Sequence, residues 1–349
     1  MSATEQRRYP KDSLGRRLRG RRTPSGKRIV LTARDVEILT ILKRYRFLRS
    51  TTLWQLLPEG LRGRSFKRFQ DRLTDLFHET RTPHEGAYLD WPVQQRQSFD
   101  ARYSPSIYAL STAGKAALDE LGIEVDNVTD LGMKDKRSST KDFAHVLMIC
   151  DTLSSIEIGT KKTTNIRFIP WPEILRKARP TGCRQGGIVS LPVTISCRFN
   201  TSRVLQRQSF NLEPDGLFGL EYEHPTGRKL YRFFALEAER RNKVHTASLR
   251  GSSYVKKILA YRYILENGIY KTELGLPNLL ILTVTLNSAR IRTMKEAVTS
   301  IYGPKGSPNF LFHSIPVHGE ISMQLNGLPD LLSDPWERAE YGPFYVNLI

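Results

Sequence analysis

The chain has 349 residues, and its 54 Lys and Arg outnumber its 35 Asp and Glu, which gives a formal net charge of +19. With 39% hydrophobic residues, it is long and apolar enough for two globular domains, and this composition excludes a wholly disordered chain. The charge favours a polyanionic partner, either nucleic acid or an anionic membrane surface, and no apolar run reaches the ~18 residues needed to span a membrane.

Residues 1–30 are expected to form a disordered basic arm. They carry ten Lys or Arg against only Glu5 and Asp12, and few large apolar side chains. Such a segment cannot bury enough surface to fold alone. We expect the arm to contact DNA phosphates and to add salt-dependent affinity. The alternative is a tail that only keeps the protein in solution.

Residues 31–125 are predicted to form a winged helix-turn-helix domain. Apolar side chains recur at helical spacing in three segments, and the first opens with a capping box, Thr32-Ala-Arg-Asp35. A short turn between the second and third helices suits helix-turn-helix geometry. The predicted elements are helices at about 32–45, 50–57 and 64–79, a hairpin wing over 88–110 with its tip at 94–102, and a closing helix at 111–121.

The third of these helices is the predicted recognition helix, because one of its faces is basic. Arginine reads guanine through two hydrogen bonds, whereas Lys and Ser mostly reach phosphate. A winged helix that binds protein and leaves this face in water is the alternative. The candidate DNA contacts are Arg64, Ser65, Lys67, Arg68 and Arg72 on the helix, with Arg96 and Arg102 in the wing.

The remaining sequence predicts a linker over 126–140, a second domain over 141–320 and an irregular tail over 321–349. The tail is interrupted by Pro and Gly. In the second domain the pattern is helix, antiparallel hairpin, helix, strand, helix, which fits an α/β sandwich of restriction-endonuclease type. Its predicted elements are helices at about 142–157, 171–177, 253–267 and 288–300, and strands at 165–170, 216–222, 230–238, 279–286 and 310–315.

The predicted hairpin gathers acidic side chains. If its turn centres near Thr226, Asp215 faces Glu237 and Glu213 faces Glu239, and side-chain alternation places Glu237 and Glu239 on one face. Facing like charges are destabilising unless a cation or a proton lies between them, and carboxylate oxygens suit hard divalent ions. We therefore expect Asp215, Glu237 and Glu239 to bind Mg²⁺ or Mn²⁺, with Glu213 at the rim. Alternatively, these are turn residues and solvated strand acids paired with basic neighbours.

Pro214-Asp215 followed by Glu237-Ala238-Glu239 resembles the hairpin of the PD-(D/E)xK nuclease superfamily, although Glu239 stands where that motif usually has Lys. The order of several short segments resembles the replication-relaxation family of mobile-element proteins, which has an N-terminal winged helix and a restriction-endonuclease-like second half. These segments are Leu31–Asp35, Tyr45–Leu48, Pro214-Asp215, Phe233–Arg240 and Lys257–Tyr261.

The resemblance implies a metal-assisted site in which a lysine stabilises the charged transition state. Glu239 cannot act as that lysine, so Lys256 or Lys257 on the next helix is expected to reach in. The implied catalytic group is therefore Asp215, Glu237, Glu239, Lys256 and Lys257. Alternatively, Glu239 adds a metal ligand, or the site is a relic that only binds.

The function expected from the sequence is that of a double-stranded DNA-binding protein of a mobile element, acting in plasmid replication or conjugative mobilisation. Two alternatives stay open: a Mg-dependent DNA endonuclease, and a winged-helix transcriptional regulator with a C-terminal assembly domain. A relaxase or a replication initiator is the expected protein partner, a homodimer is left open, and no membrane partner is expected. The cysteines, Cys150, Cys183 and Cys197, form no CxxC pair, which indicates a reducing, cytoplasmic location.

Overall fold

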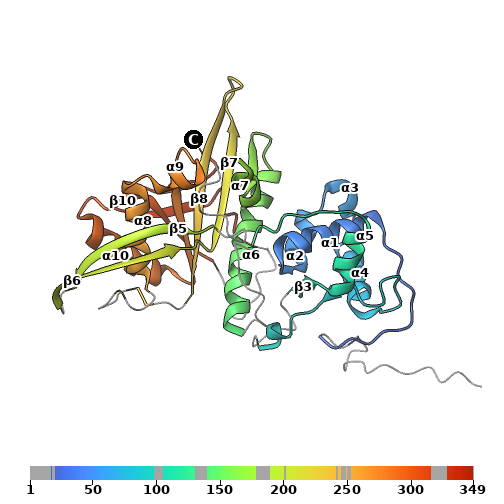
Figure 1. Ribbon diagram of the computed structural model, residues 1–349. Helices are drawn as coiled ribbons and strands as arrows, with labels where there is room; N and C mark the ends of the chain where they lie inside the picture. The colour runs from blue at the N-terminus through green and yellow to red at the C-terminus, as the bar shows by residue number, and fades with distance from the viewer. Residues whose placement is uncertain are drawn as a thin grey trace, which may run out of the picture. The chain divides into compact units, whose positions relative to one another are not determined.

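The computed structural model describes residue 17 and residues 20–97, 105–129, 140–177, 189–199, 202–240, 243–244, 249, 253–315 and 328–348. The chain divides into two compact units, residues 1–127 and residues 128–349. Each unit combines helices with strands, so the fold is mixed α/β (Figure 1). Of the linker predicted over 126–140, residues 130–139 lie outside the described part of the chain.

In its described residues, unit 1 packs helices against a three-stranded antiparallel sheet with strand order β1-β3-β2. The predicted capping box is confirmed: the Thr32 side chain accepts a hydrogen bond from Asp35 N, and the Asp35 carboxylate accepts one from Thr32 N. Ile38, Phe69 and Leu73 are fully buried in the core. The elements are α1 (Ala33–Tyr45), β1 (Leu48–Arg49), α2 (Ser50–Leu56), α3 (Glu59–Arg62), α4 (Phe66–His78), β2 (Leu89–Asp90), β3 (Ile107–Leu110) and α5 (Thr112–Glu120).

Unit 1 differs from the prediction between its second and third helices and in its wing. The one-turn helix α3 lies where a plain turn is predicted; it follows Pro58 and ends at Gly63, whose φ of 75° suits glycine. The wing strand is shorter than predicted and leads into a 3₁₀ helix, Val93–Gln97. There the Gln95 side chain hydrogen-bonds both the N–H and the C=O of Ile107, so a side chain replaces strand pairing.

The prediction that residues 1–30 are disordered is wrong for residues 20–30, which pack on unit 1. Ile29 is fully buried and its N–H donates to the Arg81 carbonyl at 3.1 Å. Thr23 N donates to His78 Nδ1 at 3.0 Å, and Ser25 donates from N and Oγ to the buried Glu79 carboxylate. These partners lie about fifty residues away, so local composition cannot reveal them. Residues 1–16, 18 and 19 lie outside the described chain.

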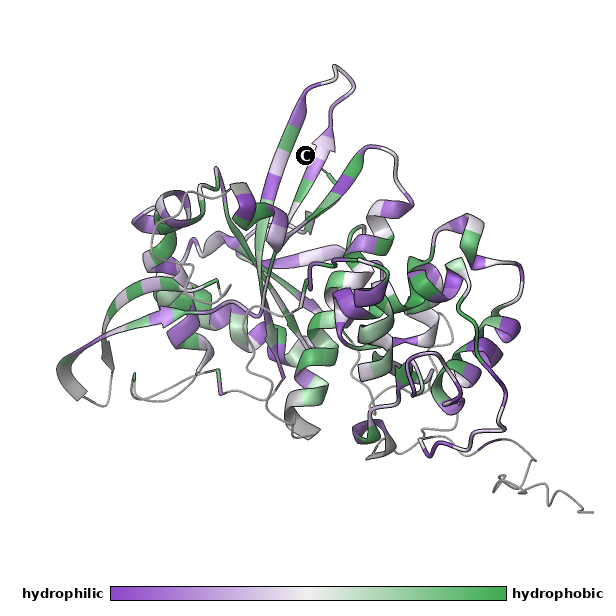
Figure 2. Ribbon diagram, turned by 45° about the vertical axis from the view of Figure 1, so that its right-hand side comes forward, coloured by the Kyte–Doolittle hydropathy of each residue, from purple (hydrophilic) through white to green (hydrophobic). Residues whose placement is uncertain are grey.

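In its described residues, unit 2 has a seven-stranded mixed sheet with strand order β12-β11-β10-β9-β8-β7-β4. β8, β9 and β10 run parallel, and the other neighbours pair antiparallel. The centre of the sheet is mostly hydrophobic, whereas the projecting end of the β7–β8 hairpin carries more hydrophilic residues (Figure 2). The strands are β4 (Ile166–Pro170), β7 (Gly216–Glu223), β8 (Lys229–Glu239), β9 (Leu280–Thr285), β10 (Ser307–Ser314), β11 (Pro335–Ala339) and β12 (Phe344–Tyr345).

Helices and a separate two-stranded ribbon complete unit 2. The ribbon strands pair antiparallel, and the second of them is not predicted from the sequence. Leu191, Val193 and Ile195 of the first ribbon strand are buried in the core that also holds Ile258 and Tyr261. The elements are α6 (Thr140–Lys161), α7 (Trp171–Lys177), β5 (Leu191–Phe199), β6 (Ser202–Leu212), α8 (Tyr254–Glu266), α9 (Ile269–Leu274) and α10 (Ser288–Tyr302).

The tail predicted to be irregular over 321–349 instead contributes two strands to the sheet. β11 pairs with β10 and β12 pairs with β11, and Trp336 of β11 is fully buried. Both strands are too short to show a clear alternation of apolar and polar residues, and their pairing depends on β10, which is distant in sequence. Residues 316–327 lie outside the described part of the chain.

Candidate functional site

The β7–β8 hairpin has the register that the sequence predicts. Gly216 pairs with Leu236 and Glu223 with Lys229, so the turn centres on Thr226. Asp215 directly precedes β7, and its Oδ2 accepts a hydrogen bond from Ala238 N at 2.9 Å. This bond fixes the Asp215 carboxylate beside the two glutamates that flank Ala238.

Glu237 and Glu239 lie on one face of β8, and both are completely buried, whereas the Asp215 side chain is 18% exposed. β9 runs parallel to β8 and places Thr283 beside Glu237 and Thr285 beside Glu239. Glu213, expected at the rim, is exposed. The hairpin therefore brings the carboxylates of Asp215, Glu237 and Glu239 together at the end of β8, next to β9.

Helix α8 supplies the cation of this cluster. Lys257 Nζ lies 2.7 Å from Glu239 Oε1 and 3.7 Å from Asp215 Oδ2, and it donates a hydrogen bond to Glu237 Oε2. Of the two lysines that the sequence leaves open, Lys257 is thus the one that reaches the acids. Lys256 lies instead over the Phe210 ring, with Nζ 4.5 Å from its centroid.

Two further residues belong to the cluster, although neither is predicted from the sequence to lie there. His145 on α6 lies with Nε2 3.2 Å from Asp215 Oδ1, and the Tyr261 hydroxyl donates to Glu237 Oε1. Tyr261 follows Lys257 by four residues, a spacing that places both on one helix face and that is a usable signal in the sequence. No such local signal exists for His145, because α6 precedes the hairpin by more than fifty residues.

The cluster is electrostatically asymmetric. The pKa of Glu237 is raised to about 7, mainly by burial; Lys257 opposes this rise and the charge of Asp215 adds to it. Burial is therefore a larger cause of this rise than repulsion by the neighbouring carboxylate. Burial also acts to raise the pKa of Asp215, yet Lys257 and His145 outweigh it and hold that pKa well below its usual range. The three carboxylates in turn overcome burial and raise the pKa of Lys257.

The donor set has the chemistry of a divalent-ion site, because three carboxylates converge. They converge, however, on the Lys257 ammonium group, which stands where an ion would bind. Correspondingly, no group of three or more His, Cys, Asp or Glu side chains in the described residues is arranged to hold a metal ion. In this arrangement the three carboxylates therefore neutralise the Lys257 ammonium group.

The predicted recognition helix is α4, and Ser65 is its N-cap, with Oγ accepting from Arg68 N. Arg64, Lys67 and Arg68 are exposed, and Lys67 pairs with Asp71 one turn later. Arg72 is different: its guanidinium donates to both oxygens of the buried Asp35 carboxylate and to the Val30 carbonyl.

Arg72 therefore ties α4 to the start of α1, and it cannot turn towards DNA without removing the counter-ion of the buried Asp35 carboxylate. Of the wing candidates, Arg96 lies in the 3₁₀ helix, and its side chain is not described. Arg102 lies outside the described residues. The structure thus leaves the first turn of α4 as the exposed basic part of the predicted recognition surface.

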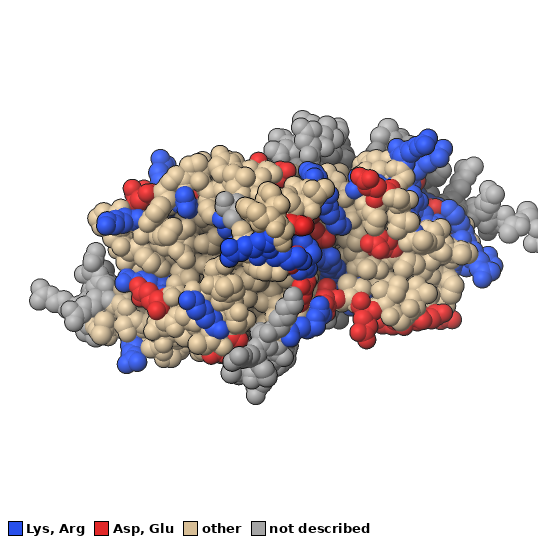
Figure 3. Space-filling view, turned by 90° about the horizontal axis from the view of Figure 1, so that it is seen from above, with Lys and Arg blue, Asp and Glu red and all other residues tan. Residues whose placement is uncertain are grey.

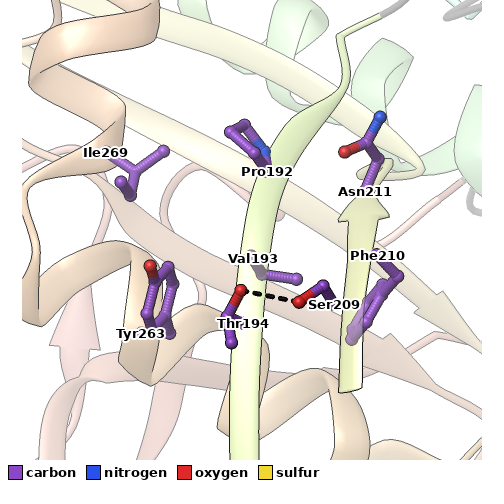
Figure 4. Close-up of a pocket in the computed structure, with 8 residues that line it drawn as sticks. All are labelled: Pro192, Val193, Thr194, Ser209, Phe210, Asn211, Tyr263 and Ile269. Carbon is purple, nitrogen blue, oxygen red and sulfur yellow. Dashed lines mark hydrogen bonds between the residues drawn. The ribbon is translucent and has the colours of Figure 1, made fainter. Parts of the chain in front are cut away.

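A separate hollow of about 380 Å³ lies between the β5–β6 ribbon and helices α8 and α9 (Figure 4). Thr194 and Ser209 face each other across the ribbon and share a hydrogen bond of 2.9 Å, and Tyr263 and Ile269 close the other side. Its lining includes no carboxylate, imidazole, ammonium or guanidinium group.

The model of a protein family described as replication-relaxation matches residues 39–280, which is well over half of the chain. The chain belongs to the replication-relaxation family. The matched range contains α4, the β7–β8 hairpin and α8, so both candidate sites lie within it. Membership indicates a role in plasmid replication or mobilisation.

Other comparisons add no relative. No match was found for the chain among curated proteins or among solved structures. Within the described residues, no helix is both long enough and apolar enough to cross a membrane.

Proposed function

We propose that this replication-relaxation protein binds double-stranded DNA through unit 1, acting as a winged helix, and that it positions a nuclease-like unit 2 at a plasmid site during replication or conjugative mobilisation. The observation that carries the proposal is the exposed basic start of α4, where Arg64 lies just before the helix and Lys67 and Arg68 lie in its first turn. In helix-turn-helix proteins, the N-terminal residues of the recognition helix contact base edges.

The surroundings of α4 support this assignment. α2 packs against both α1 and α4. Strand β1 lies between α1 and α2, and β2 and β3 follow α4 to complete the three-stranded antiparallel sheet, which is the element order of a winged helix. On the face shown in Figure 3, Lys and Arg side chains are interspersed with Asp and Glu. The net charge of +19 adds a sequence-independent attraction to DNA phosphates.

Fluorescence anisotropy with a duplex oligonucleotide from the host plasmid tests DNA binding. Arg64→Ala and Arg68→Ala should each weaken binding by ~1–3 kcal/mol if the arginine reads a base. Lys115→Ala removes an exposed positive charge from α5 and is the matched control for loss of charge alone. Equal affinities for all three variants and the wild type would contradict the assignment of α4.

A second candidate function, a metal-dependent DNA endonuclease, is favoured by the acid–lysine cluster. α6, then antiparallel β4, β7 and β8, then α8 and the parallel strand β9 follow the order expected of a restriction-endonuclease-like core. In this candidate function Lys257 of α8, which lies 2.7 Å from Glu239, would stabilise the negative charge of the transition state. It would take the role of the lysine that the nuclease motif usually has on the strand. A divalent ion in such a site would polarise the phosphate and activate water.

Thermal melts with and without Mn²⁺ separate these roles. Mn²⁺ should raise the melting temperature of the wild type by mass action, and Asp215→Ala combined with Glu237→Ala should abolish the rise. Glu213→Ala is the control, because this exposed acid stands outside the cluster. A shift without any cleavage of plasmid DNA would indicate a nuclease-derived binding domain. If Mn²⁺ does not change the melting temperature, the metal-dependent role is contradicted and a role in assembly is favoured for unit 2.

A further inference from the structure

We propose that Lys257 is the resident cation of the Asp215–Glu237–Glu239 cluster, and that a divalent ion reaches these carboxylates only by displacing its ammonium group. This inference rests on the proposed metal binding of unit 2 and concerns how that binding is controlled. It treats the lysine as an internal competitor of the metal and not only as its helper.

The distances make the two cations mutually exclusive. The ammonium group lies 2.7 Å from Glu239 Oε1, donates to Glu237 Oε2 and is 3.7 Å from Asp215 Oδ2. Mg²⁺ and Ca²⁺ bind oxygen ligands at ~2.0–2.6 Å, so an ion bound by the same three oxygen atoms, on the side where Nζ lies, would occupy the space of the ammonium group. Both cations cannot be coordinated by this set of oxygens together.

Burial gives the order in which an incoming ion meets these groups. The Glu237 and Glu239 side chains have no exposed surface, whereas those of Lys257 and Asp215 are 21% and 18% exposed. An ion arriving from solvent therefore encounters Lys257 and Asp215 before either glutamate. The four-carbon stem of a lysine is flexible enough to let the ammonium group move out towards solvent.

The other contacts of the acids do not depend on Lys257. Asp215 keeps the Ala238 N–H and His145, and Glu237 keeps the Tyr261 hydroxyl. The oxygen cage thus remains oriented after the ammonium group leaves. Displacement exchanges one cation for another on a cage that is already formed, which is why the lysine should weaken metal affinity without preventing binding.

The first test uses the wild-type protein and its two adjacent lysines. Acetic anhydride labels exposed amines, and mass spectrometry reports the extent of labelling at Lys256 and Lys257 separately. Adding Mn²⁺ should speed acetylation of Lys257 several-fold and leave Lys256 unchanged. Unchanged or slower labelling of Lys257 while Mn²⁺ binds would overturn the proposal.

The second test measures Mn²⁺ affinity by electron paramagnetic resonance of the free ion. Lys257→Met should bind Mn²⁺ at least tenfold more tightly than the wild type, and Lys256→Met should match the wild type. If the wild type binds Mn²⁺ and Lys257→Met binds it no more tightly, this inference fails and the metal site stands. If neither protein binds Mn²⁺, the proposed metal role fails with it. Labelling of the wild type keeps the proposal testable if Lys257→Met does not fold.

Discussion

Replacing Arg72 by alanine is expected to destabilise unit 1, although the sequence placed this residue among the DNA contacts. Its guanidinium donates to Asp35 Oδ1 at 2.9 Å, to Asp35 Oδ2 at 2.6 Å and to the Val30 carbonyl at 2.8 Å. The Asp35 side chain has no exposed surface, and that of Arg72 is only 17% exposed. The substitution therefore leaves a buried carboxylate without its counter-ion.

The size of the effect follows from this burial. Removing one partner of a buried ion pair costs ~3–5 kcal/mol. Asp35 would keep two donors, Thr32 N and Thr32 Oγ1, so we expect the lower end, about 3 kcal/mol. A loss of this size is a large part of the total stability of a small domain. It should speed exchange through opening of α1 by roughly a hundredfold.

Hydrogen exchange read by mass spectrometry measures this opening in the full chain, because peptides from α1 and α4 report on unit 1 alone. Arg68→Ala is the matched control: it lies one turn earlier on the same helix, is exposed, and should change stability by no more than ~0.5 kcal/mol. Unchanged exchange in Arg72→Ala together with weakened duplex binding would refute the structural role and return Arg72 to the DNA surface.

Three further outcomes are expected. Deleting residues 1–16 should flatten the salt dependence of DNA binding without changing stability. Deleting residues 1–30 should also lower the urea midpoint of unit 1, because the buried Ile29 and the Ser25–Glu79 hydrogen bonds are lost. Equal urea midpoints for the two deletions would contradict this. Burial lowers the pKa of His78 from 6.5 to about 4, so the folded state binds this proton less readily than the unfolded chain. The free energy of unfolding is therefore highest above pH 6.5 and falls as the pH drops towards 4. If the urea midpoint of His78→Gln has the same pH dependence as that of the wild type, His78 is not the source of this change. Gly219→Ala should cost ~1–3 kcal/mol by overpacking, because its new Cβ would lie 2.8 Å from the Phe233 ring; Gly342→Ala, with open space around it, is the control in a thermal melt.

Local pairings were the part of this protein that its sequence determined. The Thr32–Asp35 capping box and the Thr226-centred hairpin are both observed as predicted. In each case the partners are close along the chain, and backbone geometry leaves one arrangement that satisfies their hydrogen bonds. The convergence of Asp215 with Glu237 and Glu239 follows from that register, so the acidic half of the candidate site could be derived from spacing.

The tertiary structure alone decided which distant groups meet these local features. It selected Lys257 over Lys256, brought His145 of α6 to Asp215, and turned Arg72 away from the predicted DNA surface to Asp35. It also ordered residues 20–30 on α4 and paired β11 with β10. These contacts join residues far apart in sequence, where neither periodicity nor propensity carries information about the partner. For Lys257 and Arg72, burial of the partner carboxylates explains why the pairing is required, because an unpaired buried charge is costly.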